Sequence, residues 1–397
     1  MNSAFPLSLP QRWSVTLLLL TLVPNLVPVA TAQPAQLRPA QLLYAGGVPL
    51  EPGDYAIPCV ADWNGDGKKD LIVGYRYADK VALYLNAGSD PSPIFTNYVN
   101  LQAGGADIYV PGSGCGAPAP FVCDYDSDGQ RDLLVGDGTY GYVYFYRNTN
   151  TDAAPILAPG AALMVGASPL SVTYRATPCV YDWDGDGLHD LLCGNGDGYV
   201  FFFKNTGTAQ VPTFAAGTRI QAGGADLNLG YRSVPRVFDW DGDGLKDLVG
   251  SSDSGVYWCR NLGNNSSPSL QARVALRAPV ASGSGLQPIQ TGGRMRLELA
   301  DWNNDGTFDL LIGNASGTVS YYEGYAFRFT RMTMLPSGQH VCEWNSASNL
   351  AYQVLAGLSV NAVTNLVVTN LASGGAMTRW TNDTTADAQF YRVRIAQ

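Results

Sequence analysis

Charged residues and histidines are scarce in this chain of 397 residues. Only 14% of the residues are charged, and the two histidines, His189 and His340, have no evident catalytic partner. The sequence therefore offers no evident histidine for a Ser-His-Asp triad. It also contains neither a phosphate-binding loop nor a dinucleotide fingerprint. The net charge is −9 and basic runs are absent, which argues against nucleic-acid binding. We assign no catalytic residues.

Long apolar runs are also scarce, and the one of note lies at the N-terminus. Arg12 precedes an apolar stretch over residues 13–29, which is followed by small residues. This pattern predicts a secretory signal peptide over residues 1–32, cut before Gln33. A membrane anchor is the weaker alternative, because the run is short and contains two prolines. We therefore expect a secreted or cell-surface protein without a membrane span after signal cleavage.

The seven cysteines show no CxxC spacing, so the sequence offers no zinc or redox motif. Their odd number leaves at least one unpaired in an exported chain. Cys179 and Cys193 flank one acidic loop symmetrically, which allows a disulfide across a hairpin, and Cys115 with Cys123 is a second candidate pair. The alternative for all of them is a small buried residue within a strand.

One acidic motif is abundant and occurs five times. Its copies begin at Asp62, Asp124, Asp182, Asp239 and Asp301, and the third reads DWDGDGLHDLLCG. A period near sixty residues indicates an array of supersecondary units. Each unit reads as strand, acidic loop, strand, Gly turn, strand, polar turn, strand, which is the makeup of a four-stranded propeller blade. High Gly content without a sustained period of 3.6 excludes a helical solenoid.

We therefore predict an all-β fold, a β-propeller of five four-stranded blades over residues 33–326. Residues 37–52 resemble the end of a unit, so we expect them to supply the outermost strand of the last blade and to close the ring. The acidic motif is absent after residue 326. Residues 327–397 are predicted to form a small C-terminal β-sandwich used for display or attachment.

The acidic motif has the donor pattern of a calcium loop. Oxygen-bearing residues stand at positions one, three, five and nine, position seven offers its carbonyl, and Gly at position six allows a sharp bend. Ca²⁺ takes ~6–8 oxygen ligands, whereas Mg²⁺ prefers a smaller octahedral shell. Position twelve lacks the Glu of an EF-hand. The predicted ligands of about five structural Ca²⁺ ions are Asp62, Asn64, Asp66, Lys68 and Asp70; Asp124, Asp126, Asp128, Gln130 and Asp132; Asp182, Asp184, Asp186, Leu188 and Asp190; Asp239, Asp241, Asp243, Leu245 and Asp247; and Asp301, Asn303, Asp305, Thr307 and Asp309.

Charge crowding in these loops supports the metal interpretation. The loops hold 18 of the 33 acidic residues, four in each of three loops and three in each of the other two. Carboxylates packed a few ångströms apart repel one another by ~1 kcal/mol per pair even in water. The alternative is five solvated Asx-rich turns without metal, which need only one or two such residues.

The repeated DxDxDGxxD loop followed by a strand resembles the FG-GAP/VCBS repeat family, whose best-known members are the propeller heads of integrin alpha chains. The resemblance extends from the low forties to about residue 325 and looks like a secreted bacterial type. It implies that the loop joins the first two strands of each blade on one face and binds Ca²⁺ structurally. Propellers of this family usually have seven or eight blades, so five units are a departure.

Position two of every loop is aromatic, and we expect these rings to pack between blades rather than to stack on sugars. They are Trp63, Tyr125, Trp183, Trp240 and Trp302.

A candidate ligand site lies seven residues ahead of each loop, at turns on the other face. The residues there are Tyr55, Ala117, Arg175, Arg232 and Arg294. Our hypothesis is that the three arginines ring the channel mouth and bind an anionic or carbohydrate ligand through bidentate hydrogen bonds, with tyrosine rings as stacking faces. The tyrosines are Tyr55, Tyr174 and Tyr231. The alternative is that the arginines satisfy backbone carbonyls between blades.

These observations favour a secreted, calcium-stabilised binding or adhesion module for an extracellular glycan or protein ligand. Paired-carboxylate hydrolysis needs two free acids, and most aspartates are assigned to metal. A calcium-dependent polysaccharide lyase or hydrolase is the first alternative, because some calcium propellers use Arg, Lys or Tyr as acid and base. A purely structural cell-surface protein is the second.

Overall fold

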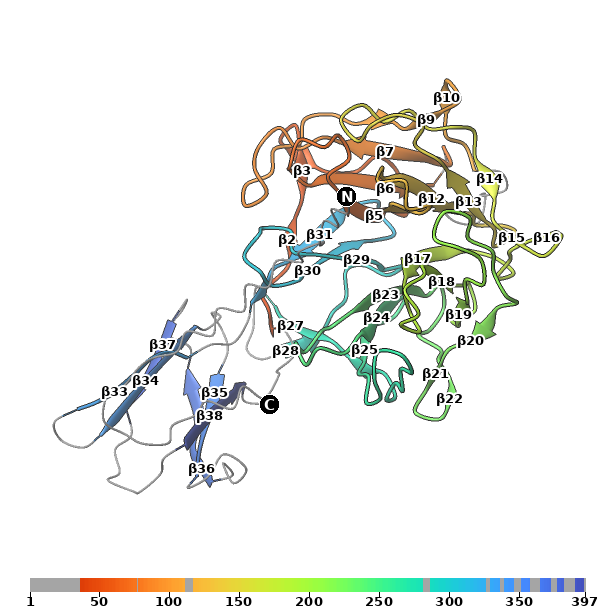
Figure 1. Ribbon diagram of the computed structural model, residues 1–397. Coiled ribbons are helices and arrows are strands. Elements are labelled where there is room, and N and C mark those ends of the chain that lie inside the picture. Colours follow the sequence, from red (N-terminus) through yellow and green to blue (C-terminus); the bar gives the residue numbers. More distant parts are fainter. Residues whose placement is uncertain are drawn as a thin grey trace, which may run out of the picture.

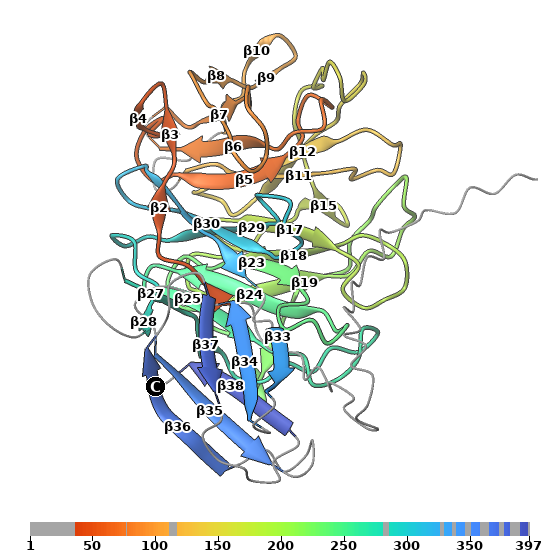
Figure 2. The same cartoon turned by 90° about the vertical axis from the view of Figure 1, so that its left-hand side faces the viewer.

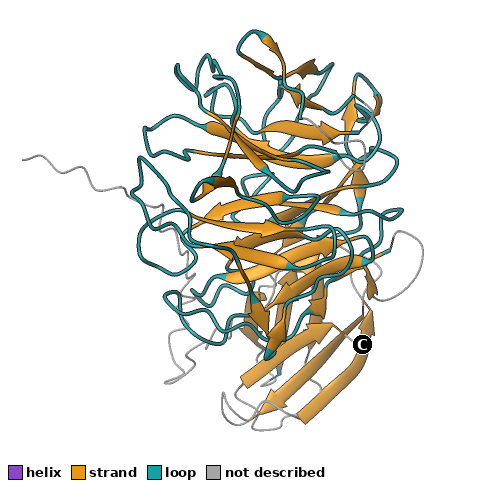
Figure 3. Ribbon diagram, turned by 90° about the vertical axis from the view of Figure 1, so that its right-hand side faces the viewer, coloured by secondary structure: helices purple, strands orange, loops and turns teal. Residues whose placement is uncertain are grey.

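The computed structural model describes residues 36–76, 78–110, 117–280, 286–325, 329–335, 339–345, 351–357, 365–372, 377–381 and 390–395. Within these segments every regular element is a strand (Figure 3). The predicted signal peptide, residues 1–32, lies outside the described residues. No helix in the described segments has the length and apolar character that crossing a membrane requires.

Five antiparallel four-stranded sheets form the blades of a propeller (Figure 1). Their strands are β5 (Ile57–Ala61), β6 (Asp70–Tyr75), β7 (Lys80–Tyr84) and β8 (Val99–Asn100); β11 (Ala119–Cys123), β12 (Asp132–Gly136), β13 (Val143–Tyr146) and β14 (Ala161–Ala162); β17 (Thr177–Tyr181), β18 (Asp190–Gly194), β19 (Val200–Phe203) and β20 (Thr218–Arg219); β23 (Val234–Phe238), β24 (Asp247–Ser252), β25 (Gly255–Cys259) and β26 (Val274–Ala275); and β29 (Arg296–Ala300), β30 (Asp309–Gly313), β31 (Val319–Tyr322) and β2 (Gln41–Leu42). The innermost strands contact one another in the order β5, β11, β17, β23, β29, and β29 contacts β5 again. The predicted five-bladed ring is confirmed.

Short two-stranded hairpins lie outside the four-stranded sheets of the blades. They are β3 (Tyr44–Ala45) with β4 (Val48–Pro49), β9 (Gln102–Ala103) with β10 (Ala106–Asp107), β15 (Met164–Val165) with β16 (Ser168–Pro169), β21 (Gln221–Ala222) with β22 (Ala225–Asp226), and β27 (Arg277–Pro279) with β28 (Leu286–Pro288).

The N-terminal segment closes the ring, as predicted. β2 pairs antiparallel with β31, so that Gln41 lies opposite Tyr321 in the sheet of the last blade. One step earlier, β1 (Gln36–Leu37) pairs with β32 (Gly324–Tyr325). Because both ends of the propeller share one sheet, opening the ring requires breaking these hydrogen bonds.

The core lies between neighbouring blades, and the aromatic at loop position two is part of it. Trp63 packs with Leu133 and Tyr146 of the following blade. Trp302 of the last blade is 2% exposed, and its ring centroid lies 6.1 Å from that of Phe95 in the first blade. These rings are buried against protein, which confirms the packing interpretation and leaves no face open to a sugar.

The glycine that ends the acidic motif is required in four of the five blades by the close approach of the next blade; the exception is Gly250, where a Cβ would meet Leu229 of the same unit. A Cβ at Gly74 would lie 1.8 Å from the carbonyl oxygen of Pro118, and one at Gly313 would lie 2.1 Å from that of Ala56. Neither glycine has a positive φ, so the constraint is space between blades and not backbone conformation.

We expect Gly74→Ala to lower the free energy of unfolding by about 3 kcal/mol, since overpacking forces the two blades apart. Urea unfolding at fixed calcium concentration measures the change. Gly47→Ala is the comparison variant, because its Cβ meets no atom within 4 Å and only the left-handed backbone, at about 1 kcal/mol, is strained. Equal losses in the two variants would contradict a steric role for Gly74.

The disulfide that the sequence allows between Cys179 and Cys193 is not formed. Cys179 lies opposite Leu192 in the hairpin and Cys193 lies opposite Pro178, so the two side chains point to opposite faces of the sheet. Both are buried free thiols. Cys123 is also free, and its proposed partner Cys115 lies outside the described residues. Cys179 and Cys193 therefore fit the alternative, a small buried residue within a strand.

Beyond the propeller, two three-stranded sheets form a separate unit to one side (Figures 1 and 2). One consists of β33 (Phe329–Met334), β34 (His340–Asn345) and β37 (Met377–Thr381), the other of β36 (Asn365–Ala372), β35 (Ala351–Gly357) and β38 (Phe390–Ile395). Val341 and Trp344 of β34 are buried. The predicted boundary after residue 326 falls among residues 326–328, outside the described part, and stays a prediction.

Candidate functional site

Each acidic loop joins the first two strands of a blade. Position nine is the first residue of the second strand and pairs with the last residue of the first, as in Ala61 with Asp70 and Phe238 with Asp247. Gly at position six adopts a positive φ in every loop, for example 84° at Gly67 and 86° at Gly244. This left-handed residue bends the backbone so that the alternate side chains converge.

Carboxylates hold the loop backbone in the same way in each blade. In the first loop, Asp62 Oδ2 accepts a hydrogen bond from the Gly67 N–H at 3.1 Å, and Asp66 Oδ1 accepts one from the Lys68 N–H at 2.9 Å. The fifth loop repeats these bonds with Asp301 and Asp305. At position seven the structure therefore shows a bonded N–H, and the predicted use of that residue's carbonyl as a ligand stays a prediction.

Three of the loops bring three carboxylates together, with one oxygen of each lying within 4.8 Å of the others. These triads are Asp124, Asp126 and Asp132; Asp182, Asp184 and Asp190; and Asp239, Asp241 and Asp247. In the first and fifth loops, Asn64 and Asn303 replace the central aspartate. The five loops thus share one backbone geometry but differ in charge.

Unpartnered oxygens in these loops fit a cation. The Oδ1 atoms of Asp126, Asp184 and Asp241 are buried and accept no hydrogen bond, and Asp62 Oδ1 is in the same state. A buried carboxylate oxygen without a partner is costly, and a hard divalent cation bound by carboxylates removes that cost. The three triads are therefore suited to the Ca²⁺ ions that such loops bind.

Basic residues that the sequence analysis missed hold the other oxygen of the central aspartate. Arg147 Nε lies 2.7 Å from Asp126 Oδ2, and Arg260 Nε lies 2.7 Å from Asp241 Oδ2. Lys204 contacts Asp184 in the same position of the third loop. The basic side chain orients each central aspartate so that the unpartnered oxygen of that aspartate remains in the loop.

The sequence does carry a signal for these cations. They directly follow the third strand and precede an Asn, in YRN, FKN and CRN. In the first and fifth loops position three is Asn instead of Asp, and the residue equivalent to these basic residues is Leu85 or Glu323. A basic residue thus accompanies the fourth aspartate in all three loops that have it.

The position-nine aspartates are both candidate ligands and structural residues. Asp247 is fully buried and accepts hydrogen bonds from the backbone N–H groups of Trp240 and Asn261 at 3.2 and 2.7 Å and from the indole N–H of Trp258 at 2.8 Å. Burial raises the pKa of Asp247 to about 6 and that of Asp309 to about 7. Protons therefore compete with a cation for such groups, and the affinity for the cation should fall as the pH falls below these pKa values.

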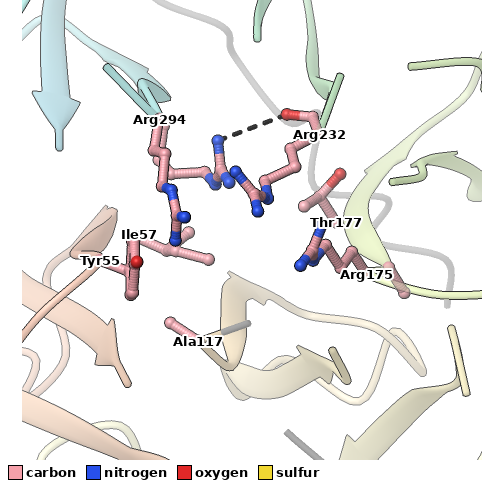
Figure 4. Close-up of a pocket in the computed structure, with 9 residues that line it drawn as sticks. Tyr55, Ile57, Ala117, Arg175, Thr177, Arg232 and Arg294 are labelled. Carbon is pink, nitrogen blue, oxygen red and sulfur yellow. Dashed lines mark hydrogen bonds between the residues drawn. The ribbon is translucent and has the colours of Figure 1, made fainter. Parts of the chain in front are cut away.

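The predicted mouth residues lie at the opposite end of the innermost strands, seven residues or roughly 23 Å of extended chain from the first aspartate of each loop. One pocket contains Tyr55, Ala117, Arg175, Arg232 and Arg294 (Figure 4). The same pocket is lined by Ile57, Ala176, Thr177 and Arg296. Four arginines thus converge on one cavity, of which sequence reasoning found three; Arg296 lies two residues after Arg294 and carries no separate signal.

The two other predicted tyrosines pack beside the arginines. The guanidinium carbon of Arg175 lies 5.5 Å from the Tyr174 ring centroid and 5.2 Å from that of Tyr231. The guanidinium of Arg175 also donates a hydrogen bond to the Tyr231 hydroxyl. Arg232 lies 4.4 Å from the Tyr231 ring, so this tyrosine connects two of the arginines.

A buried ion pair links two neighbouring innermost strands, β23 and β29. Arg236 Nη2 lies 2.7 Å from Glu298 Oε2, and both residues are less than 10% exposed. The Arg236 guanidinium carbon also lies 5.2 Å from the Phe121 ring centroid. These side chains thus join the innermost strands β11, β23 and β29 of three blades.

Comparisons with known proteins agree with this geometry. Residues 239–312 match the FG-GAP-like repeat. Integrin alpha-4 of Xenopus laevis is 30% identical over 166 residues, a segment that covers 38% of this chain and 15% of the integrin. The chain therefore matches only a small part of that relative.

Solved structures show similarity at the level of the fold. A GH43_1 enzyme from Xanthomonas citri complexed with xylose is 14% identical, with 73% of this chain and 91% of that chain covered and a TM-score of 0.38. An Agrocybe aegerita lectin that recognises non-reducing terminal N-acetylglucosamine is 16% identical, with 89% and 87% covered and a TM-score of 0.33. Neither similarity carries functional information at these TM-scores. The repeat match, the acidic loops and the blade architecture together support an FG-GAP-like repeat β-propeller with distant homology to integrin alpha chains.

Proposed function

We propose that this protein is an exported binding module, stabilised by about five Ca²⁺ ions, that holds an extracellular ligand at the channel mouth. The observation that carries the proposal is a contrast between the two faces. The acidic loops are near-copies of one another, whereas the equivalent mouth positions carry Tyr55, Ala117, Arg175, Arg232 and Arg294. A repeated scaffold with varied residues at one rim is the usual arrangement of a binding surface.

Calcium is the ion that we assign to all five loops. The ligands are carboxylate, amide and carbonyl oxygens in flexible loops, whereas Mg²⁺ needs a stricter octahedral shell and retains water. The three triads and the unpartnered oxygens support this assignment. The first and fifth loops keep the same turn, with Asn64 and Asn303 offering amide oxygens.

A calcium-dependent polysaccharide lyase is the second candidate, because Arg175 contacts the Tyr231 hydroxyl and such a pair can serve acid–base chemistry. Tyr174, the other tyrosine beside Arg175, is a poor base, because burial and its hydrogen bond to Asp197 raise its pKa to about 12. We therefore place binding ahead of catalysis, and both ahead of a purely structural role.

A glycan array probed with calcium-loaded protein tests the proposal. We expect retention of a defined set of glycans that is lost in EDTA, because the rim depends on the folded scaffold. Incubation with acidic polysaccharides, monitored by absorbance for unsaturated products, separates the candidates: product release favours the lyase. Absence of any bound glycan or extracellular protein would contradict the binding role.

A further inference from the structure

We propose that the arginine pocket, defined by Arg175, Arg232, Arg294 and Arg296, binds one anionic group, the carboxylate or sulfate of an acidic polysaccharide. This inference rests on the proposed binding function and names its ligand class.

The pocket concentrates positive charge with little compensation. The described residues that line it include four arginines and no acidic side chain. Asp253 pairs with the cluster from its edge, 2.5 Å from Arg232 Nη1 and 3.5 Å from Arg296 Nη1. Figure 4 shows the side chains of Arg175, Arg232 and Arg294 directed toward a common space. Four guanidinium groups around one carboxylate leave a positive cavity that an anion neutralises.

The cluster carries an electrostatic cost in the free protein. Burial, with repulsion from Arg175 and Arg294, lowers the pKa of Arg232. Burial also lowers the pKa of Arg296 to about 10, and Arg232 and Arg175 add to that shift. Like charges that repel one another in the unliganded state gain most when an anion enters between them.

Hydrogen bonds that stabilise the fold explain some of the four arginines but not all of them. Arg296 donates to the carbonyls of Met295 and Arg232 at 2.9 and 3.4 Å, so it supports the pocket wall. Arg294 differs: its guanidinium carbon lies 4.0 Å from the Tyr55 ring centroid, and it makes no hydrogen bond within the described segments. Its donors are thus directed to the cavity and available to a ligand.

The backbone at the mouth is strained to present these side chains. Tyr55, Arg175, Arg232 and Arg294 all adopt a positive φ, between 53° and 63°. A left-handed conformation costs about 1 kcal/mol or more for a non-glycine residue. Glycine would remove this strain at each position, but it would also remove the guanidinium or the ring.

The size of the pocket and its rim favour an acidic group carried on a sugar. The cavity volume is about 20 Å³, on the order of one water molecule, so a sugar ring stays outside and only an oxygen of its acid group enters between the arginines. Tyr231 is 46% exposed at the edge and offers a flat face beside Arg175 and Arg232. A sugar ring can stack there while its acid group reaches the arginines.

The experiment measures binding of oligogalacturonate, dextran sulfate and neutral dextran to the full-length calcium-loaded protein by calorimetry. The test variant is Arg175→Gln/Arg294→Gln. The matched control is Arg219→Gln, an exposed arginine paired with Asp226 on the outer strand of a blade. We expect the wild type and the control to bind an acidic probe equally and the double variant to bind it at least tenfold more weakly. Binding of oligogalacturonate alone identifies a carboxylate ligand, and binding of dextran sulfate alone identifies a sulfate ligand.

Further arms separate this inference from the proposed function. Equal acidic-probe affinity in wild type and double variant overturns the inference. So does wild-type binding of neutral dextran as tightly as of the acidic probes, unchanged in the double variant, although the binding function then stands. Binding of poly-glutamate as tightly as oligogalacturonate, unaffected by Tyr231→Ala, overturns the assignment to a sugar. A melting temperature within 2 °C of wild type, on the order of 1 kcal/mol for a domain of this size, shows that the double variant is folded.

Discussion

Removal of divalent cations with EDTA is expected to lower the melting temperature of the propeller by at least about 10 °C. Each ion present at a hundred times its dissociation constant stabilises the folded state by about 2.7 kcal/mol, and five loops act together. A change of 1 kcal/mol shifts the melting temperature of a large domain by about 2–4 °C. Circular dichroism melting curves measure the shift in melting temperature. One is recorded in about 1 mM calcium, an order-of-magnitude choice of saturating ligand, and the other in EDTA.

Two controls define the result. Elemental analysis should find about five Ca²⁺ ions per chain, and magnesium should restore the melting temperature less completely. Residues 327–397 carry no acidic motif, so a transition from that part of the chain should not move. A melting curve that is the same with and without chelator, together with protein free of calcium, would contradict the metal assignment.

The propeller was predictable from sequence because its information is repeated. Five copies of one motif align the blades, and the partial unit near Leu42 indicates which strand must close the ring. The same alignment placed Arg175, Arg232 and Arg294 at equivalent positions, which the structure brings to one pocket. Because equivalent residues of repeated blades lie at equivalent places in the ring, the repeats alone predict which residues lie close together.

Single-copy features were not predictable in this way. Cys179 and Cys193 are symmetric about the first and last aspartates of their loop, but Asp190 is already part of the strand and pairs with Tyr181. The true symmetry axis is therefore shifted by one residue, and a shift of one residue turns a side chain to the other face. Arg236 and Glu298 lie 62 residues apart. They occupy the same repeat position, three residues ahead of the first loop aspartate, but the other three units carry Cys59, Phe121 and Cys179 there, so the repeat does not mark this position as charged.

The fifth-position and ninth-position aspartates should respond differently to substitution. Asp247→Ala leaves three donors without an acceptor, the backbone N–H groups of Trp240 and Asn261 and the indole N–H of Trp258. Each unsatisfied buried donor costs about 1–3 kcal/mol, so we expect a loss of roughly 5 kcal/mol from the free energy of unfolding. Because these bonds exist without an ion, the loss should appear in EDTA as well as in calcium.

Asp243→Ala, in the same loop, is the matched variant. Asp243 Oδ1 accepts a hydrogen bond from the Leu245 N–H, and Asp243 Oδ2 pairs with Arg260 Nη2 at 2.9 Å. Both contacts lie in an exposed part of the loop, where water can replace the carboxylate and Arg260 keeps Asp241 as a partner. We expect little change in EDTA and a loss of about 2.7 kcal/mol in calcium, the contribution of one ion. Urea unfolding of both variants under both conditions gives the four values. If Asp247→Ala were as stable as the wild type in EDTA, position nine would act only as a ligand, and the tether between the first, second and third strands of the blade would lie elsewhere.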